Sequence, residues 1–72
     1  MDDEPVMDVV VNGKKVEFPE PITVAELLAQ HHLHPTRVAV ELNREILPRK
    51  EYNSAQIKSG DQIEIVTFVG GG

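Results

Sequence analysis

The sequence predicts an α+β fold, in which a mixed sheet of four to five strands carries one main helix packed across it. Three observations lead to this prediction. Two β-branched or apolar runs flank Asn12-Gly13, which is the strongest short-range signal of a hairpin. The following segment changes to a helical period, and a third alternating segment comes after it. A crossover helix between strands of one sheet makes that sheet mixed.

The hairpin is expected to have strands at Met7–Val11 and Lys15–Phe18. The helix is expected from Val24 to about His32, because apolar side chains recur at the spacing of one helical face. Thr23 and Glu26 form a capping box at its start, which marks the first turn clearly. These two elements are the best-defined part of the prediction.

The second half of the chain predicts shorter elements. Val38, Val40 and Leu42 alternate with polar or small residues, so a strand is expected at Arg37–Leu42. An edge fragment around Ile46 and a helical turn at Asn53–Gln56 are expected next. The last strand, Gln62–Val69, buries Ile63 and Ile65 on one face, and places Val66 and Phe68 on the other.

Composition limits the function. The chain has 72 residues, 40% hydrophobic content and no cysteine, which predicts one small domain without disulfides or thiolate chemistry. A formal charge of −5 disfavours nucleic acid and favours a basic protein partner. No apolar run approaches the roughly 20 residues that cross a bilayer, so we expect a cytoplasmic monomer without membrane contact.

We divide the chain into an acidic leader at residues 1–5, expected to be disordered, a domain at 6–69 and a flexible glycine tail at 70–72. Terminal glycines alone are a weak signal, because chain ends commonly fray. Here, apolar Val66, Phe68 and Val69 stand directly before the tail, which indicates a surface for partner binding beside a flexible chain end.

A tail without Cβ atoms can pass through a narrow channel and bring its carboxylate to a buried reactive centre. Because a free carboxylate is a poor acyl donor, a partner must activate it, most simply by letting it attack the α-phosphate of ATP. We therefore predict that Gly72 is the reacting residue, and that Gly71 and Gly70 serve its passage. ATP should bind the partner, since no phosphate-binding loop is visible in this sequence.

The chain resembles the ThiS-like sulfur carriers of thiamine biosynthesis, which have a ubiquitin-like β-grasp fold. The resemblance covers Met7 to Gly72 and rests on "TVAELL", "ELNREILPR", "SGDQIEIV" and the glycine end. It implies that an adenylyltransferase related to ubiquitin-activating enzymes adenylates Gly72, and that a persulfide donor then converts it to a thiocarboxylate. It also implies that thiazole synthase receives the sulfur, and that the chain is a protein co-substrate without a bound cofactor.

Three other functions stay open at this point. The small subunit of molybdopterin synthase shares the fold and the diglycine, and differs in the acceptor of its sulfur. A ubiquitin-like modifier would instead be joined to lysines of other proteins. A β-grasp binding module with an inert tail is the third alternative.

The sequence "HHLH" at His31–His34 raises the question of a metal site. Adjacent helical residues diverge by about 100°, so their imidazoles do not converge on one ion. We therefore predict no metal site.

Overall fold

The computed structural model describes residues 6–68. The leader at 1–5, Val69 and the whole tail at 70–72 therefore lie outside the described residues. The strands and helices are, in chain order, β1 (Met7–Val11), β2 (Lys14–Phe18), β3 (Ile22–Thr23), α1 (Val24–Gln30), a 3-10 helix (Pro35–Arg37), β4 (Val38–Leu42), β5 (Glu45–Leu47), a second 3-10 helix (Arg49–Glu51), β6 (Gln56–Ile57) and β7 (Gln62–Thr67).

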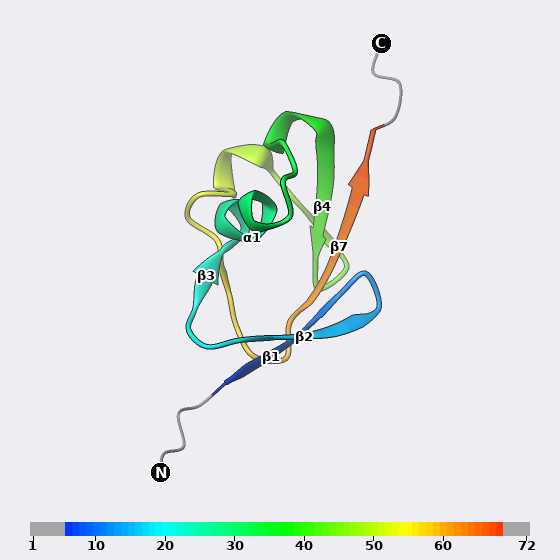
Figure 1. Cartoon of the computed structure of the whole chain (residues 1–72). Coiled ribbons are helices and arrows are strands. Elements are labelled where there is room, and N and C mark those ends of the chain that lie inside the picture. The colour runs from blue at the N-terminus through cyan, green and yellow to red at the C-terminus, as the bar shows by residue number, and fades with distance from the viewer. Residues whose placement is uncertain (1–5, 69–72) are drawn as a thin grey trace.

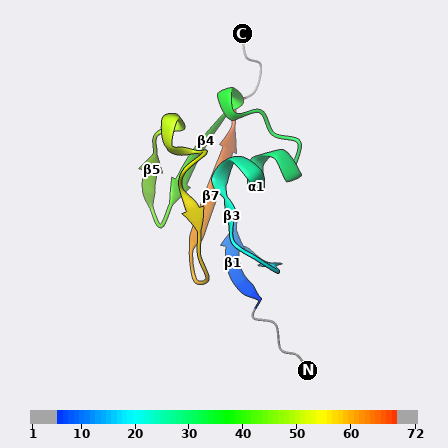
Figure 2. The same ribbon diagram turned by 90° about the vertical axis from the view of Figure 1, so that its left-hand side faces the viewer.

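Five strands form one mixed sheet in the order β2-β1-β7-β4-β5, with α1 packed across one face (Figure 1). β7 runs parallel to β1 and antiparallel to β4, so the last strand of the chain lies in the middle of the sheet. This confirms the predicted fold class. Figure 2 shows the helix on one side of the sheet and the edge strand β5 at its far end.

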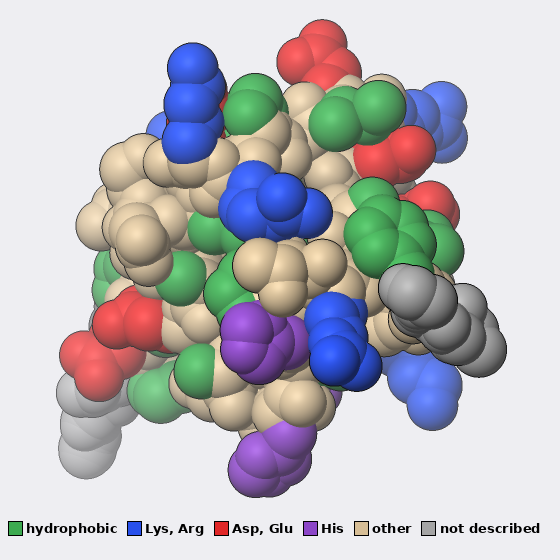
Figure 3. Space-filling view, turned by 90° about the horizontal axis from the view of Figure 1, so that it is seen from above, with side chains coloured by type: hydrophobic (Ala, Val, Ile, Leu, Met, Phe, Trp, Pro, Cys, Tyr) green, Lys and Arg blue, Asp and Glu red, His purple; other side chains and the backbone are tan. Residues whose placement is uncertain are grey.

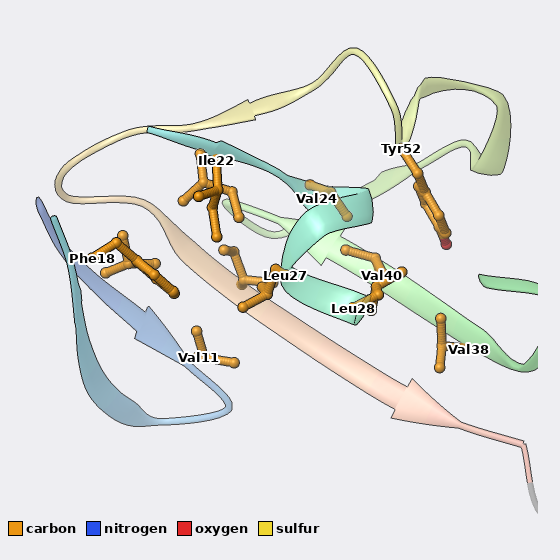
Figure 4. Packing of buried hydrophobic residues seen from close by; sticks show 12 residues of the cluster. Val11, Phe18, Ile22, Val24, Leu27, Leu28, Val38, Val40 and Tyr52 are labelled. Atoms are coloured by element: carbon orange, nitrogen blue, oxygen red, sulfur yellow. The ribbon is translucent and has the colours of Figure 1, made fainter. Parts of the chain in front are cut away.

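The core fills the space between α1 and the sheet. Leu27 and Leu28 of the helix are at most 1% exposed, and they face strand residues that are equally buried (Figure 4). Full burial of such a side chain stabilises the fold by about 1.5–3 kcal/mol. The other members of the core are Val9, Val11, Phe18, Ile22, Val24, Val38, Val40, Tyr52, Ile57 and Ile63. Ile65, predicted to be buried, packs against the core while remaining half-buried.

The hairpin turn forms as predicted. Asn12 and Gly13 have φ values of 50° and 82°, the pair of positive angles that a two-residue type I′ turn requires. The turn between β4 and β5 repeats this geometry at Asn43 and Arg44, with φ values of 54° and 71°. Asparagine tolerates this region better than most residues with a Cβ atom, which explains its place in both turns.

The helix starts where the capping box predicts, with both reciprocal hydrogen bonds between Thr23 and Glu26. Its predicted end at about His32 is wrong, because α1 stops at Gln30. His32 adopts a left-handed φ of 60°. The His32 amide donates to the Ala29 carbonyl at 3.0 Å and the Leu33 amide to the Leu28 carbonyl at 2.8 Å. These two bonds form a Schellman motif, which closes the helix two residues early.

The predicted helical turn at Asn53–Gln56 is also wrong. The helical turn lies earlier, at Arg49–Glu51, and Gln56–Ile57 forms strand β6. β6 pairs with β3 in a second, two-stranded sheet. The start of α1 fixes this segment, since the Val24 amide donates to the Ala55 carbonyl at 3.0 Å.

Candidate functional site

The candidate site is the end of β7 and the surface around it. β7 ends at Thr67, and Phe68 follows with its amide donating to the Arg37 carbonyl at 2.8 Å. The chain continues past Phe68 for four residues, which can span about 13 Å when extended. Their predicted roles, reaction at Gly72, passage at Gly71 and Gly70 and partner contact at Val69, concern positions outside the described residues and stay predictions.

Val66 and Phe68 lie on the face of the sheet that is turned away from α1. Val66 is 59% exposed and Phe68 is 53% exposed, which confirms that they stand outside the core. Their exposure follows from strand alternation, because Ile63 and Ile65, which precede them on β7, point toward the helix. The predicted role of Val66 and Phe68 in partner binding stays a prediction.

Sequence reasoning missed Ile46, which is 78% exposed on β5. In the sheet register Ile46 lies opposite Glu41, and Val66 lies opposite Ala39 two residues earlier on β4. Ile46 and Val66 therefore lie on the same face of the sheet, on the two strands that flank β4. The two-residue turn at Asn43-Arg44 already fixes this pairing, so the hairpin register was the signal that could have found Ile46. We call Ile46, Val66 and Phe68 the apolar patch.

Carboxylates border the apolar patch. Glu41 and Glu64 lie directly opposite each other on β4 and β7, with Ile46 on the other side of Glu41. Two like charges in opposite positions destabilise an antiparallel pair by a few tenths of a kcal/mol to about 1 kcal/mol. A small hollow of about 340 Å³ also borders them, with Arg44 at its edge. The arrangement suits a partner that brings a basic side chain to this face.

The histidines take separate positions. His31 caps α1, His32 is the left-handed residue after it, and the His34 ring Nδ1 lies 3.0 Å from the Thr36 hydroxyl. Residues 6–68 contain no group of three His, Cys, Asp or Glu side chains arranged to hold a metal. None of the helices in the same part of the chain is long and apolar enough to cross a membrane.

Known proteins match this fold and this end of the chain. The model of the ThiS family matches residues 5–72. The chain belongs to the ThiS family. The sulfur carrier protein ThiS of Bacillus subtilis is 41% identical over 63 residues, which cover 86% of this chain and 96% of that protein. The resemblance seen in the sequence is thereby confirmed.

A solved structure of the ThiS family agrees. The crystal structure of the thiamine biosynthesis protein ThiS from Geobacter metallireducens has a TM-score of 0.78 at 38% identity, and the match covers 92% of this chain and 100% of that one.

A thiazole synthase of Paramagnetospirillum magneticum is 41% identical over 66 residues. Those residues make up 92% of this chain, which spans only 20% of the thiazole synthase.

Proposed function

We propose that this ThiS-family chain is a sulfur carrier of thiamine biosynthesis, a cytoplasmic protein co-substrate on which partner enzymes act. One observation carries the proposal: the central strand β7 leads the chain out of the domain beside exposed Val66 and Phe68. A central strand is held rigidly by the strands on both sides, so a partner bound at the apolar patch would receive the end of the chain in a fixed direction. The membership of the ThiS family supports the same role.

The proposed chemistry takes place at the Gly72 carboxylate. One carboxylate oxygen attacks the α-phosphate of ATP on the activating enzyme, and pyrophosphate leaves. The resulting acyl-adenylate is an activated acyl donor, so a persulfide sulfur can attack its carbonyl carbon and expel AMP. A thiol then cleaves the sulfur–sulfur bond and is itself oxidised to a disulfide. The product at Gly72 is a thiocarboxylate, whose sulfur passes to thiazole synthase for the thiazole ring.

The surface supports docking to enzymes of complementary charge. The chain carries a formal charge of −5, and Glu41 and Glu64 add local negative charge beside the apolar patch. A partner with an apolar socket and basic side chains around it would relieve the repulsion between these carboxylates when it binds. We propose this complementarity for the adenylyltransferase.

The thiamine pathway is favoured over molybdopterin synthesis by one comparison. The thiazole synthase of Paramagnetospirillum magneticum contains a segment that is 41% identical to this chain. A carrier segment within the same polypeptide as the acceptor enzyme suggests that the two parts work together. We extend that association to this chain and propose thiazole synthase as the sulfur acceptor.

Complementation tests the choice of pathway. We expect the chain to restore growth without added thiazole to a bacterium that lacks its own ThiS. We expect no restored molybdoenzyme activity in a strain that lacks the small subunit of molybdopterin synthase. ThiS of Bacillus subtilis serves as the positive control in the first strain. Rescue of the second strain alone would contradict the thiamine assignment.

A further inference from the structure

The backbone of Thr67 presents polar groups to the side of β7 that faces β1. The Phe68 amide bonds to the Arg37 carbonyl at 2.8 Å, and the Asn43 amide bonds to the Gln62 carbonyl at 2.7 Å. Hydrogen-bonded pairs alternate along an antiparallel ladder, so the even-numbered residues of β7 bond toward β4. The odd-numbered residues, among them Thr67, point their amide and carbonyl the other way.

The β1 side of β7 is occupied as far as Ile65. The pairing with β1 ends at Val11 opposite Ile63, and the Asn12 amide donates to the Ile63 carbonyl at 2.8 Å. The side chain of Asn12 continues the ladder by one step. Its Oδ1 accepts from the Ile65 amide at 2.7 Å, and its Nδ2 donates to the Ile65 carbonyl at 3.3 Å.

Beyond Ile65 the ladder has a vacant position. The turn at Asn12-Gly13 reverses the chain into β2, so β1 does not extend alongside the end of β7 (Figure 1). Within residues 6–68, no strand is paired with Thr67 on this side. Although β7 is a central strand, the side of its last residues that faces β1 is therefore a short unpaired edge within the described residues. We call it the open edge.

A groove of about 440 Å³ runs beside this open edge. Its apolar walls come from the hairpin, from the segment after α1 and from β7, and its polar rim carries a lysine and a histidine. The residues are Val11, Val16, Leu33 and Ile65 in the walls, and Lys14 and His31 at the rim. Figure 3 views the molecule from above, and shows His and Lys or Arg side chains beside hydrophobic ones on its upper face.

We propose that an extended segment of the activating enzyme pairs with the backbone of Thr67, in the position that β1 leaves vacant. This inference rests on the proposed function, because it assigns the segment to the enzyme that receives the tail. An apolar side chain of the segment enters the groove, and a carboxylate beside it meets Lys14. Backbone pairing of this kind is strand addition, in which the main chain gives affinity and the groove gives specificity.

Other occupants fit the position less well. β1 begins at the opposite end of the molecule from the end of β7 (Figure 1), whereas Ile65 and Thr67 near the end of β7 line the groove, so the start of β1 is far from it. A second copy of the chain also carries a formal charge of −5, so the two copies would repel each other. An enzyme segment has a further advantage, since pairing at Thr67 continues along the tail and holds it extended for entry to the active site.

Hydrogen exchange at single amides tests the inference on the unaltered chain. In free, isotope-labelled protein we expect the Thr67 amide to exchange faster than the Val66 and Phe68 amides, which face β4. On addition of the activating enzyme, we expect exchange at Thr67 to slow by about tenfold or more, the effect of one added hydrogen bond in a protected site. The same sample is analysed for adenylated Gly72 by mass.

A pair of substitutions separates hydrogen bonding from simple covering of the surface. Thr67→Pro removes the amide proton, which is directed away from β4 and pairs with no strand of residues 6–68. Thr67→Val keeps the amide proton and removes the hydroxyl. We expect Thr67→Pro to raise the Kd for the activating enzyme about tenfold, and Thr67→Val to leave it unchanged. Retained protection of the Phe68 amide in free Thr67→Pro protein shows that β7 still pairs with β4.

Each outcome has one meaning. If Gly72 is adenylated while Thr67 exchanges freely, or if both variants bind equally, the inference is wrong and the proposed function stands. If the enzyme neither binds nor adenylates the chain, both are wrong. Protection of Thr67 that rises with protein concentration in the absence of enzyme identifies a second copy as the occupant and also contradicts the inference.

Discussion

A chain shortened by Gly71 and Gly72 is expected to lose detectable ATP–pyrophosphate exchange with the activating enzyme, and to keep its melting temperature. The shortened chain still ends in a glycine carboxylate, at Gly70, so the functional group is retained. Its reach falls by two residues, or about 7 Å, which leaves that carboxylate short of the α-phosphate. A displacement far smaller than this already costs orders of magnitude in rate.

The matched control removes residues from the other end. Deletion of Asp2 to Pro5 takes away more of the chain than the tail deletion does, and should leave exchange and melting temperature unchanged. Exchange at the normal rate by the chain that lacks Gly71 and Gly72 would contradict every role assigned to the tail.

Substitution of Val66 and Phe68 together by serine is expected to lower kcat/KM for activation by about 100-fold, with little change in stability. Burial of a valine or phenylalanine side chain contributes about 1.5–3 kcal/mol each, and a factor of 100 corresponds to about 2.8 kcal/mol. Part of each side chain is already covered in the free protein, so the lower part of this range applies. Since both are more than half exposed, the core loses little.

Val6→Ser provides the control for the serine double variant. Val6 is 50% exposed, comparable to Phe68, and precedes β1, so it lies outside the apolar patch. It should leave activation unchanged. An unfolded double variant would show that Val66 and Phe68 belong to the core, and unchanged kcat/KM would show that the enzyme docks elsewhere.

Most of the fold could be predicted from local signals. Asn12-Gly13 specifies a hairpin by its backbone preference, and the capping box at Thr23 fixes the start of α1, because both depend on residues close together in the chain. β3 and β6 could not be predicted in this way. A strand of two residues has no period, and it exists because α1 brings Ile22 next to Ile57.

The candidate site was partly predictable for the same reason. Alternation along the last strand predicted that Val66 and Phe68 lie outside the core. The register of the β4–β5 hairpin would have placed Ile46 on the same face. The role of Asn12 in holding β7 was not visible, because its side chain bonds to Ile65, 53 residues away. The early helix end was missed because His32 occupies a position that glycine most often takes.

Intact-mass analysis after incubation with ATP, the activating enzyme and a persulfide donor tests the central claim most directly. The account predicts a fraction of the chain that is heavier by the difference between one sulfur and one oxygen atom. Fragmentation should place the added mass at Gly72, and omission of ATP should abolish it. A single unmodified mass from active enzymes, or added sulfur at any other residue, would contradict the account.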